Sequence, residues 1–473
     1  MYYRLKDKYL LRGWEKLPYA IVDSTTGDAK FLMPEQMQAI ELCAGTVDIS
    51  MPFIPESFRQ EIMKFKDEGI IEECRQGEGL KANQEYRKYP SRYIRSVQWS
   101  VTGKCNYRCK HCYMSAPDVN AHQISHQDAM NIIDQLADCG VMNIYLTGGE
   151  PLIRDDFLEI VDALTDRGII IHQIYSNGAL VNKKFLTELD NRNLHPSFVM
   201  SYDGTDGWHD WLRGVNGAEL LVNHAFELCR DMGFRTAANM TLHSGNLYTL
   251  RDTVNHVAKL GAGQIKTAFA SDMGEWKTKG TKVSLKDIFQ TYLDYLPYYY
   301  SEDNMPIKIF FTSFFIADPT KPDEYEIIGY NDAYDPDETL LCGHARSSSY
   351  ISPEGRPLMC GLMAGIKAQE YYPTMLEKKF SECINTPEYM KLIDMRASDF
   401  LKINTKCGTC EFTKHCYGGC RGVALMENEN DLMGTSETVC EMFKGGWIKK
   451  IAETVKKARP TAICPVKDES LLI

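Results

Sequence analysis

The sequence predicts an α/β protein built around a partial (β/α)6, TIM-like barrel, and three observations support this prediction. Apolar runs of strand length alternate with amphipathic helical stretches from about residue 97 to residue 270. About six strand–helix units can be counted, which is too few for a closed eight-stranded barrel. The pattern changes on both sides of this region, and cysteines become frequent after Cys342. We therefore expect one further domain at each end.

The expected domains follow these changes along the chain. Residues 1–90 form a small N-terminal domain, 91–280 the barrel, 281–335 an irregular bridging region, 336–450 a cysteine-rich domain and 451–473 a C-terminal tail. A chain of 473 residues is too long for one compact core. The aromatic residues of the bridging region are expected to belong to the core.

The N-terminal domain has the pattern of a winged helix-turn-helix. Two short strands around a polar turn precede a segment with helical spacing, a second helix is expected at 56–68, and residues 70–74 fit a returning strand. A DNA-binding winged helix is one interpretation. However, positive and negative side chains are about equally frequent here, and no helix is rich in Lys or Arg. Residues 81–95 are expected to form a linker.

The barrel strands are expected near residues 97–102, 143–147, 169–176, 197–201, 235–242 and 264–270, with helices at 126–139, 155–167, 217–232 and 247–260. Polar or cysteine residues follow the strand ends: Cys105, Cys109 and Cys112; Gly148, Gly149 and Glu150; Ser176 and Asn177; Ser201, Asp203 and Arg213; Asn239 and Thr241. Because ligands of parallel α/β sheets bind beyond the carboxyl ends of the strands, we expect these residues on one rim.

The first cysteines have the spacing C-x3-C-x2-C. Three thiolates can hold three corners of a cubane iron–sulfur cluster and leave the fourth iron open. A zinc site is the alternative, but zinc sites usually take four ligands, often from two C-x2-C pairs. Sixteen cysteines in a chain without a secretion signal favour metal binding over disulfides, and a cytoplasmic location is expected.

This spacing, with His111 just before the third cysteine, resembles the signature of the radical S-adenosylmethionine (SAM) enzymes. The resemblance implies a 4Fe-4S cluster on Cys105, Cys109 and Cys112 and a SAM molecule on its open iron. Gly148, Gly149 and Glu150 match the family's GGE motif, which receives the SAM amino group. His111, Tyr113, Ser176, Asn177, Ser201, Asp203 and Arg213 are the further expected SAM contacts. The chemistry implied is a 5'-deoxyadenosyl radical that removes hydrogen from the substrate, with no protein nucleophile.

The C-terminal cysteines have a second pattern. Cys342 and Cys360, the latter in G-x4-C, precede Cys407, Cys410, Cys416 and Cys420 in C-x2-C-x5-C-x3-C, and Cys440 follows. This resembles the SPASM domain, which implies two auxiliary clusters and three 4Fe-4S clusters in total. By that resemblance Cys407, Cys410, Cys416 and Cys440 hold the outer cluster and Cys342, Cys360 and Cys420 the inner one. The inner cluster then has either an open iron or a distant fourth ligand such as Cys383. A zinc ribbon would leave Cys342, Cys360 and Cys440 without a role.

The N-terminal domain resembles the PqqD-like recognition element of ribosomal-peptide maturases, in which a leader peptide adds a strand to the ribbon edge. The function implied is formation of a Cys-to-α-carbon thioether (sactionine) or a related thioether in a precursor peptide, since an open iron can hold a substrate sulfur. Alternatives are carbon–carbon crosslinking, another peptide or protein modification such as sulfatase maturation, and, from a different class, a zinc-bearing winged-helix regulator. Expected partners are the leader-bearing peptide and an electron donor such as flavodoxin or ferredoxin.

Charge and hydropathy exclude two kinds of partner. The net charge of -11 argues against nucleic acid, whose binding needs a basic face. No apolar run approaches the roughly 18 residues of a membrane span. We therefore expect neither nucleic acid nor membrane as a partner.

Overall fold

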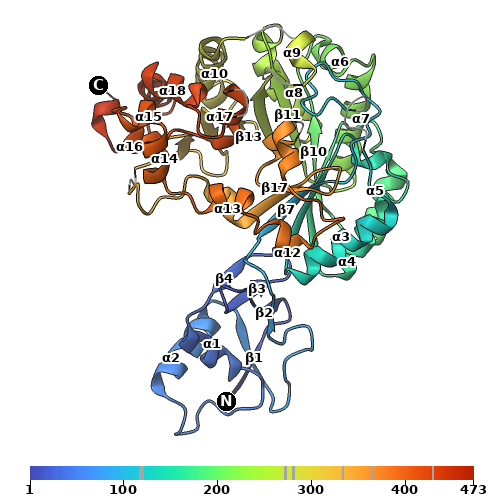
Figure 1. Ribbon diagram of the computed structural model, residues 1–473, viewed down its shortest axis with the longest axis vertical. Coiled ribbons are helices and arrows are strands. Elements are labelled where there is room, and N and C mark those ends of the chain that lie inside the picture. The colour runs from blue at the N-terminus through green and yellow to red at the C-terminus, as the bar shows by residue number, and fades with distance from the viewer. Residues whose placement is uncertain are drawn as a thin grey trace.

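The computed structural model describes residues 1–116, 122–270, 274–279, 283–332, 335–364, 366–428 and 431–472. One large sheet forms the centre of the molecule (Figure 1). Its strands are β7 (Ser96–Ser100), β8 (Asn143–Thr147), β9 (Ile170–Ser176), β10 (Ser197–Ser201), β11 (Thr236–Leu242), β12 (Gln264–Phe269), β13 (Lys308–Phe311), β14 (Phe315–Ala317), β15 (Tyr325–Ile327), β16 (Ser348–Ile351) and β17 (Pro357–Leu358).

The strand order is β15-β14-β13-β12-β11-β10-β9-β8-β7-β16-β17. Strands β7 to β13 and β16 run parallel to their neighbours, whereas β14, β15 and β17 are antiparallel additions at the two ends. The order has two ends, so the sheet does not close on itself. The six expected strands are β7 to β12, and the parallel part continues by one strand on each side.

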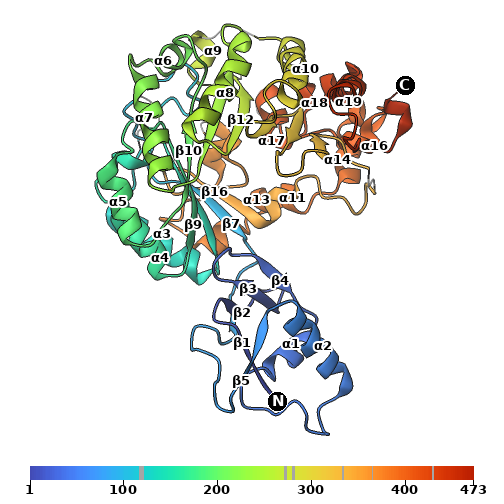
Figure 2. The same ribbon diagram turned by 180° about the vertical axis from the view of Figure 1, so that it is seen from behind.

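Helices cover the outer face of the parallel strands (Figures 1 and 2). They are α3 (His126–Asp138), α4 (Phe157–Asp166), α5 (Lys183–Asn191), α7 (Ala218–Asp231), α8 (Leu250–Leu260) and α10 (Leu285–Tyr300). Four short helices lie in the loops after strand ends: η1 (Pro151–Ile153), α6 (Trp208–Arg213), η2 (Leu247–Thr249) and α9 (Trp276–Lys279). In α8, for example, Leu250, Val254 and Val257 recur at helical spacing and are buried, which places this face against the sheet.

The bridging region is more regular than the sequence indicated, and its boundary at 280/281 lies outside the described residues. It contains α10, the β13–β14 hairpin and β15. The ring of Tyr292 stacks on Phe311 with centroids 4.5 Å apart, and both residues are buried. The aromatic residues therefore belong to the core, as expected. Sequence reasoning placed no helix here, although Ile288, Tyr292 and Tyr295 of α10 are buried at helical spacing and Lys286 and Asp294 are exposed.

The remaining C-terminal elements are short helices and turns. They are α11 (Gly343–Ser347), η3 (Gly361–Met363), η4 (Lys367–Tyr371), α12 (Phe380–Cys383), α13 (Pro387–Ile393), α14 (Ala397–Ile403), α15 (Thr405–Gly408), α16 (Thr413–Cys416), α17 (Arg421–Glu427), α18 (Glu437–Lys444), α19 (Trp447–Ala458) and η5 (Glu469–Leu471). Helix α19 runs across residue 450 and packs on α10. The start of the expected C-terminal tail is thus part of a packed helix.

The N-terminal domain has its own core. It contains β1 (Tyr2–Leu5), β2 (Tyr9–Gly13), β3 (Ala20–Asp23), β4 (Ala29–Phe31), α1 (Pro34–Glu41), α2 (Glu56–Asp67), β5 (Ile71–Cys74) and β6 (Arg87–Lys88). One sheet has the order β4-β3-β2-β6, and β1 pairs with β5. Residues 81–95 are packed rather than a loose linker: β6 pairs with β2, and the buried Gln84 side chain donates to the carbonyls of Lys6 and Tyr9.

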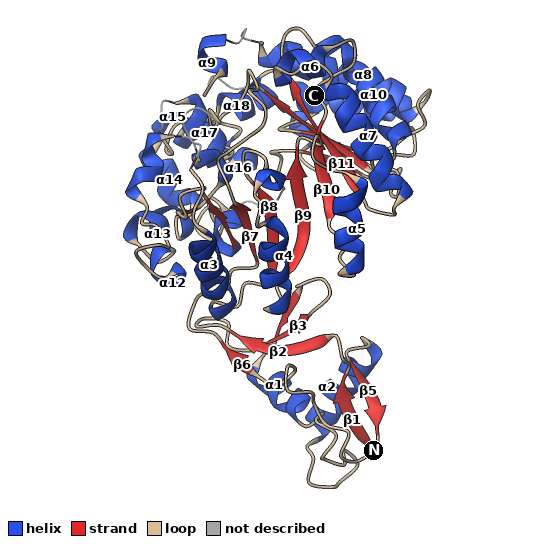
Figure 3. Cartoon of the chain, turned by 90° about the vertical axis from the view of Figure 1, so that its right-hand side faces the viewer, coloured by secondary structure: helices blue, strands red, loops and turns tan. Residues whose placement is uncertain are grey.

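The N-terminal domain contacts the barrel at the N-terminal ends of its strands (Figure 3). The fully buried Trp14 donates its indole N–H to the Cys139 carbonyl at 3.1 Å. Asn143, the first residue of β8, donates to the Gly27 carbonyl at 3.4 Å. No helix within the described residues is long and apolar enough to cross a membrane.

Candidate active site

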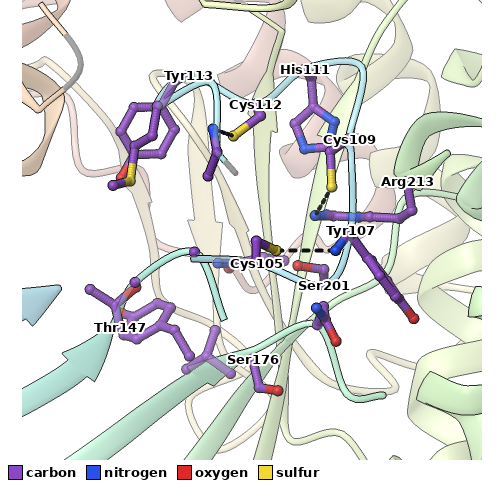
Figure 4. A pocket seen from close by; sticks show the side chains of 18 of the residues that line it. Cys105, Tyr107, Cys109, His111, Cys112, Tyr113, Thr147, Ser176, Ser201 and Arg213 are labelled. Carbon is purple, nitrogen blue, oxygen red and sulfur yellow. Dashed lines mark hydrogen bonds between the residues drawn. The ribbon is translucent and has the colours of Figure 1, made fainter. Parts of the chain in front are cut away.

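A cavity of about 310 Å³ lies at the C-terminal ends of strands β7 to β11 (Figure 4). Its lining includes most of the residues that the sequence motifs had singled out. The lining residues are Gln98, Cys105, Tyr107, Cys109, His111, Cys112, Tyr113, Met114, Ala116, Thr147, Gly148, Gly149, Tyr175, Ser176, Asn177, Val199, Ser201, Arg213 and Asn239. Glu150 and Asp203 are fully buried behind this wall, and Thr241 is not among the lining residues.

The segment after β7 brings three thiols to the cavity, and each sulfur accepts a hydrogen bond. Cys105 Sγ accepts from the Tyr107 amide at 3.4 Å, and Cys112 Sγ from the Ala116 amide at 3.3 Å. Cys109 Sγ accepts from Arg213 Nη1 at 3.7 Å (Figure 4). Burial raises the pKa of Cys105 to about 12. The donors around the sulfurs nevertheless suit thiolates, because a bound metal deprotonates its thiol ligands.

Gly148 and Gly149 allow the turn after β8 to pack on the cysteine segment. A Cβ atom on Gly148 would lie 2.5 Å from the Thr102 carbonyl oxygen, and one on Gly149 would lie 2.3 Å from that of Lys104. The Gly149 amide donates to the Thr102 carbonyl at 2.8 Å. The resemblance to the GGE motif assigns these residues to the amino group of SAM, and the structure adds that the two glycines lie against the backbone of the cysteine segment. Any side chain here would displace that segment.

Glu150 connects neighbouring loops from beneath the cavity. Its fully buried carboxylate accepts from the Ser176 hydroxyl at 3.0 Å and from the Asn177 amide at 2.8 Å. The Asn177 side chain in turn donates to Asn106 in the cysteine segment at 2.8 Å. Burial raises the pKa of Glu150 to about 7, although these donors oppose the shift. Glu150 thus holds the loops after β8 and β9 together.

Asp203 and Arg213 form a buried ion pair. Asp203 Oδ2 accepts from Arg213 Nε at 2.6 Å, and Oδ1 accepts from the Thr241 amide at 2.9 Å. Burial alone would raise the pKa of Asp203, but the Arg213 guanidinium outweighs it and holds that pKa well below its usual range. Arg213 faces the cavity while Asp203 lies wholly behind it. Asp203 therefore supports Arg213 and does not itself line the cavity.

Several lining residues were missed by sequence reasoning. Gln98, Tyr175 and Val199 project from strands, where alternation identifies an inward position but not its role. Within the part of the chain that the structure describes, the buried Tyr107 hydroxyl and His111 Nδ1 have no hydrogen-bond partner. Unpaired buried polar atoms at a cavity wall fit a polar ligand, because leaving them unpaired is costly.

The C-terminal cysteines gather in two groups. Four of them, Cys407, Cys410, Cys416 and Cys440, line one small cavity of about 20 Å³. The other three are electrostatically coupled to one another and each directly precedes a helix: Cys342 before α11, Cys360 before η3 and Cys420 before α17. These are the two sets that the resemblance to the SPASM domain implies.

Arg421 lies between the two groups. Its buried guanidinium donates to the carbonyls of Gly418, Gly419, Leu432 and Gly434. It interacts electrostatically with Cys407 and Cys416 of the first group and with Cys420 of the second. Cys383 is elsewhere: it lies in α12, which packs on α3, and its thiol donates to the Lys378 carbonyl at 3.8 Å. The structure does not bring Cys383 to the group of three.

No three His, Cys, Asp or Glu side chains among the described residues converge on a point where one metal ion could bind. An iron–sulfur cluster needs a different arrangement, because its thiolates surround several irons. The assignment of the two C-terminal groups and the first triad as cluster ligands stays a prediction.

Comparison with known proteins identifies the central part of the chain. Residues 99–257 match the profile of the Radical SAM superfamily. This part of the chain is a radical SAM domain. It contains the cysteine triad, the two glycines and the buried Asp203–Arg213 pair.

The similarity extends beyond the radical SAM domain. The chain is 26% identical over 335 residues to the AdoMet-dependent heme synthase of Methanosarcina barkeri, a match that covers 70% of this chain and 92% of that protein. It is 22% identical over 352 residues to the PqqA peptide cyclase of Gluconobacter oxydans, covering 73% and 90%.

Solved structures share the fold. The crystal structures of Streptococcus suis SuiB bound to S-adenosylmethionine and to the precursor peptide SuiA superpose with TM-scores of 0.62 and 0.66. Each is 16% identical and covers 93% of this chain and 100% of that one. At this identity the similarity shows a shared fold, and residues 99–257 are the part of the chain that matches the Radical SAM superfamily, whose members use a 4Fe-4S cluster and S-adenosylmethionine.

Proposed function

We propose that this radical SAM enzyme forms a thioether in a ribosomally synthesised peptide, by joining a cysteine sulfur to an α-carbon. The observation that supports this most is the gathering of seven C-terminal cysteines into a group of four and a group of three. A group of three thiolates leaves one iron of a cubane cluster open, and an open iron can bind a substrate sulfur. Carbon–carbon crosslinking has no such use for an open iron.

The residues present fit three 4Fe-4S clusters and one SAM molecule. Cys105, Cys109 and Cys112 would hold the SAM cluster, and Cys342, Cys360 and Cys420 the inner auxiliary cluster of a SPASM domain. The outer auxiliary cluster would be held by Cys407, Cys410, Cys416 and Cys440. When bound, these groups supply a 5'-deoxyadenosyl radical and an acceptor for the electron left by bond formation.

The protein's part in this chemistry is positioning and exclusion of water. His111 and Tyr113 would flank the adenine, and the backbone of Gly148 and Gly149 would face the amino group of SAM. Arg213, held by Asp203, offers a positive charge for the SAM carboxylate. Ser176, Asn177 and Ser201 offer hydrogen bonds for the ribose.

The proposed partner is a precursor peptide whose leader binds the N-terminal domain. Strand β4 is an edge strand, and a groove beside it is lined by Tyr9, Ile21, Ala29, Lys30 and Ile70. An extended peptide can add a strand to such an edge, the mode of a PqqD-like recognition element. Two of the relatives support a peptide partner: the PqqA peptide cyclase is named for a peptide, and SuiB has been solved with the precursor peptide SuiA bound. Flavodoxin or ferredoxin is the proposed electron donor.

Substitution of the triad tests the radical chemistry. We expect Cys105→Ala, Cys109→Ala and Cys112→Ala each to abolish 5'-deoxyadenosine formation by the anaerobically reconstituted enzyme, measured by liquid chromatography. Cys229→Ala is the control, because Cys229 is buried in α7 away from the cavity and should leave the product unchanged. Persistent 5'-deoxyadenosine in the triad variants would refute this cluster assignment.

Co-expression tests the substrate and the bond. A short cysteine-rich reading frame next to the gene is co-expressed with the enzyme, and the peptide is expected to lose two hydrogen atoms per crosslink. Fragmentation should locate each crosslink at a cysteine, and Cys→Ser peptides should lose it. Crosslinks that survive in Cys→Ser peptides would establish carbon–carbon bond formation instead.

The similarity to AdoMet-dependent heme synthase favours a second candidate, modification of a heme precursor. The two candidates differ in what stimulates SAM cleavage. We expect 5'-deoxyadenosine formation to rise with the co-expressed peptide and not with an iron porphyrin. The reverse result would favour the second candidate.

A further inference from the structure

Lys266 lies on β12 and points into the barrel. Its neighbours in sequence, Ile265 and Thr267, are fully buried, and the Thr267 hydroxyl is 2.7 Å from the Tyr292 hydroxyl on the outer helix α10. Because successive side chains of a strand point to opposite faces, Lys266 faces inward. Its side chain is exposed there, so the inside of the barrel has room at this position.

Lys266 belongs to one row of inward residues across four strands. Ser201 on β10 pairs in register with Asn239 on β11, Asn239 with Lys266, and Lys266 with Phe310 on β13. Ser201 and Asn239 line the proposed SAM cavity. Lys266 is thus one strand beyond that cavity, and its ammonium lies over the Phe310 ring, 5.1 Å from the centroid.

The ammonium of Lys266 has no acidic partner within the described ranges. Lys308, on the neighbouring strand, is the contrast: its ammonium forms an ion pair with Asp318 at 3.2 Å. An ammonium without a paired carboxylate in the confined space of the barrel can bind an arriving carboxylate without first breaking an ion pair. Asn239, its neighbour in the row, offers an amide for the same anion.

We propose that Lys266 binds a carboxylate of the substrate, namely an Asp or Glu side chain of the peptide, and so selects the segment presented to the SAM cavity. Three features support this role: the inward direction of the side chain, its place one strand from the cavity, and the lack of an Asp or Glu partner among the described residues. A charge-assisted hydrogen bond in such surroundings gives both affinity and register. The proposal rests on the proposed peptide substrate.

The test uses a pool of random hexapeptides that are acetylated and amidated, so that Asp and Glu side chains are the only carboxylates. Cluster-loaded enzyme with SAM captures peptides from this pool, and mass spectrometry measures their composition. We expect wild-type enzyme and Lys308→Met to enrich acidic residues roughly tenfold over the input pool. Lys266→Met should lose that enrichment, and Lys266→Glu should enrich Lys and Arg instead.

Two further readouts separate the possible failures. SAM cleavage without peptide should be unchanged in Lys266→Met, because Lys266 is not among the residues that line the SAM cavity. A wild-type eluate without acidic enrichment, or the same composition for wild type and Lys266→Met, overturns the proposal. A shifted midpoint potential of an auxiliary cluster in Lys266→Met, with peptide composition unchanged, would overturn it in favour of a role beside Cys360. Loss of SAM cleavage in the wild-type enzyme would instead contradict the proposed function.

Discussion

The carboxylate of Asp203 is inaccessible to solvent, yet it determines how Arg213 meets the cavity. Arg213 contacts Asp203 on one side and the Cys109 sulfur on the other. Sequence reasoning placed Asp203 at the C-terminal ends of the strands, where the structure has it just after strand β10. It could not distinguish a residue that lines the cavity from one that lies behind it, because both follow a strand end.

Removing the charge of Asp203 should destabilise the folded protein. We expect Asp203→Asn to lower the free energy of unfolding by about 3–5 kcal/mol, because it leaves the buried Arg213 charge uncompensated. Asp162→Asn is the matched control: Asp162 pairs with Arg192 at 2.6 Å but is 46% exposed, and its loss should cost less than about 1 kcal/mol. Chemical denaturation of both variants measures the difference. Equal losses of unfolding free energy in the two variants would mean that the buried pair contributes no more to stability than the exposed pair.

Glu150 should give the enzyme a pH-dependent stability. Its pKa is raised to about 7 in the folded state, against 4.5 for an ordinary Glu, so the folded protein binds the extra proton between these values. The free energy of unfolding should therefore fall as pH rises from about 4.5 to about 7. Glu150→Gln should remove this pH dependence. The difference in unfolding free energy between wild type and Glu150→Gln should therefore become smaller as the pH rises towards 7. A difference in unfolding free energy between the two proteins that stays constant from pH 5 to pH 8 would contradict the raised pKa of Glu150.

At the scale of elements, the edge strand β4 has a defined free side. The Asp23 amide donates to the Asp28 carbonyl, and the Leu32 amide donates to the Tyr19 carbonyl. Hydrogen-bonded pairs alternate along an antiparallel ladder, so Lys30 bonds to β3 while the amides of Ala29 and Phe31 point outward. These outward amides are the groups that an added peptide strand would use.

A proline at residue 29 should block the addition of a peptide strand to the free edge of β4. We expect Ala29→Pro to weaken binding of the precursor peptide roughly tenfold, because it removes one outward donor without removing a β3 bond. Ala29→Ser keeps the donor and should bind as wild type does. Fluorescence anisotropy with the labelled peptide measures both. Unchanged binding by Ala29→Pro would exclude strand addition at this edge.

Periodicity predicted most elements of the barrel, and one helix with the same signal was missed. Strands β7 to β12 and helices α3, α4, α7 and α8 were predictable because apolar positions recur at the period of a strand or a helix. Helix α10 carries this signal, since Ile288, Tyr292 and Tyr295 are buried at helical spacing while Lys286, Gln290 and Asp294 are exposed. The run of aromatic residues drew attention away from this period, so the helix was not predicted.

At the scale of the whole molecule, Trp14 fixes the N-terminal domain to the barrel. It packs on Tyr89 and Tyr93 and donates to the carbonyl at the end of α3. Sequence reasoning predicted a separate N-terminal domain but not this contact with the barrel, since contacts between distant segments leave no local pattern. A deletion of residues 1–90 would also expose the barrel surface around Met142, so a point substitution is the sharper probe.

We expect Trp14→Ala to uncouple the two domains. The loss of a fully buried indole lowers the free energy of unfolding by about 3–5 kcal/mol. Trp14 lies at the contact between the two domains, so this loss weakens that contact. Differential scanning calorimetry should resolve two transitions where wild type has one. SAM cleavage without peptide should persist while peptide turnover falls. A single transition at the wild-type temperature would refute the role of Trp14.

The N-terminal domain packs at the base of the barrel, and the cavity lies at the opposite end of the strands. This separation sets a minimum length for any substrate that binds the N-terminal domain and reacts in the cavity. Strand β9 has seven residues and spans about 20 Å from that base to the rim of the cavity. An extended chain advances at most about 3.6 Å per residue. A peptide anchored on β4 must therefore keep roughly six or more residues between its anchor and the atom that reacts. Precursors with a shorter spacer would be bound but left unmodified.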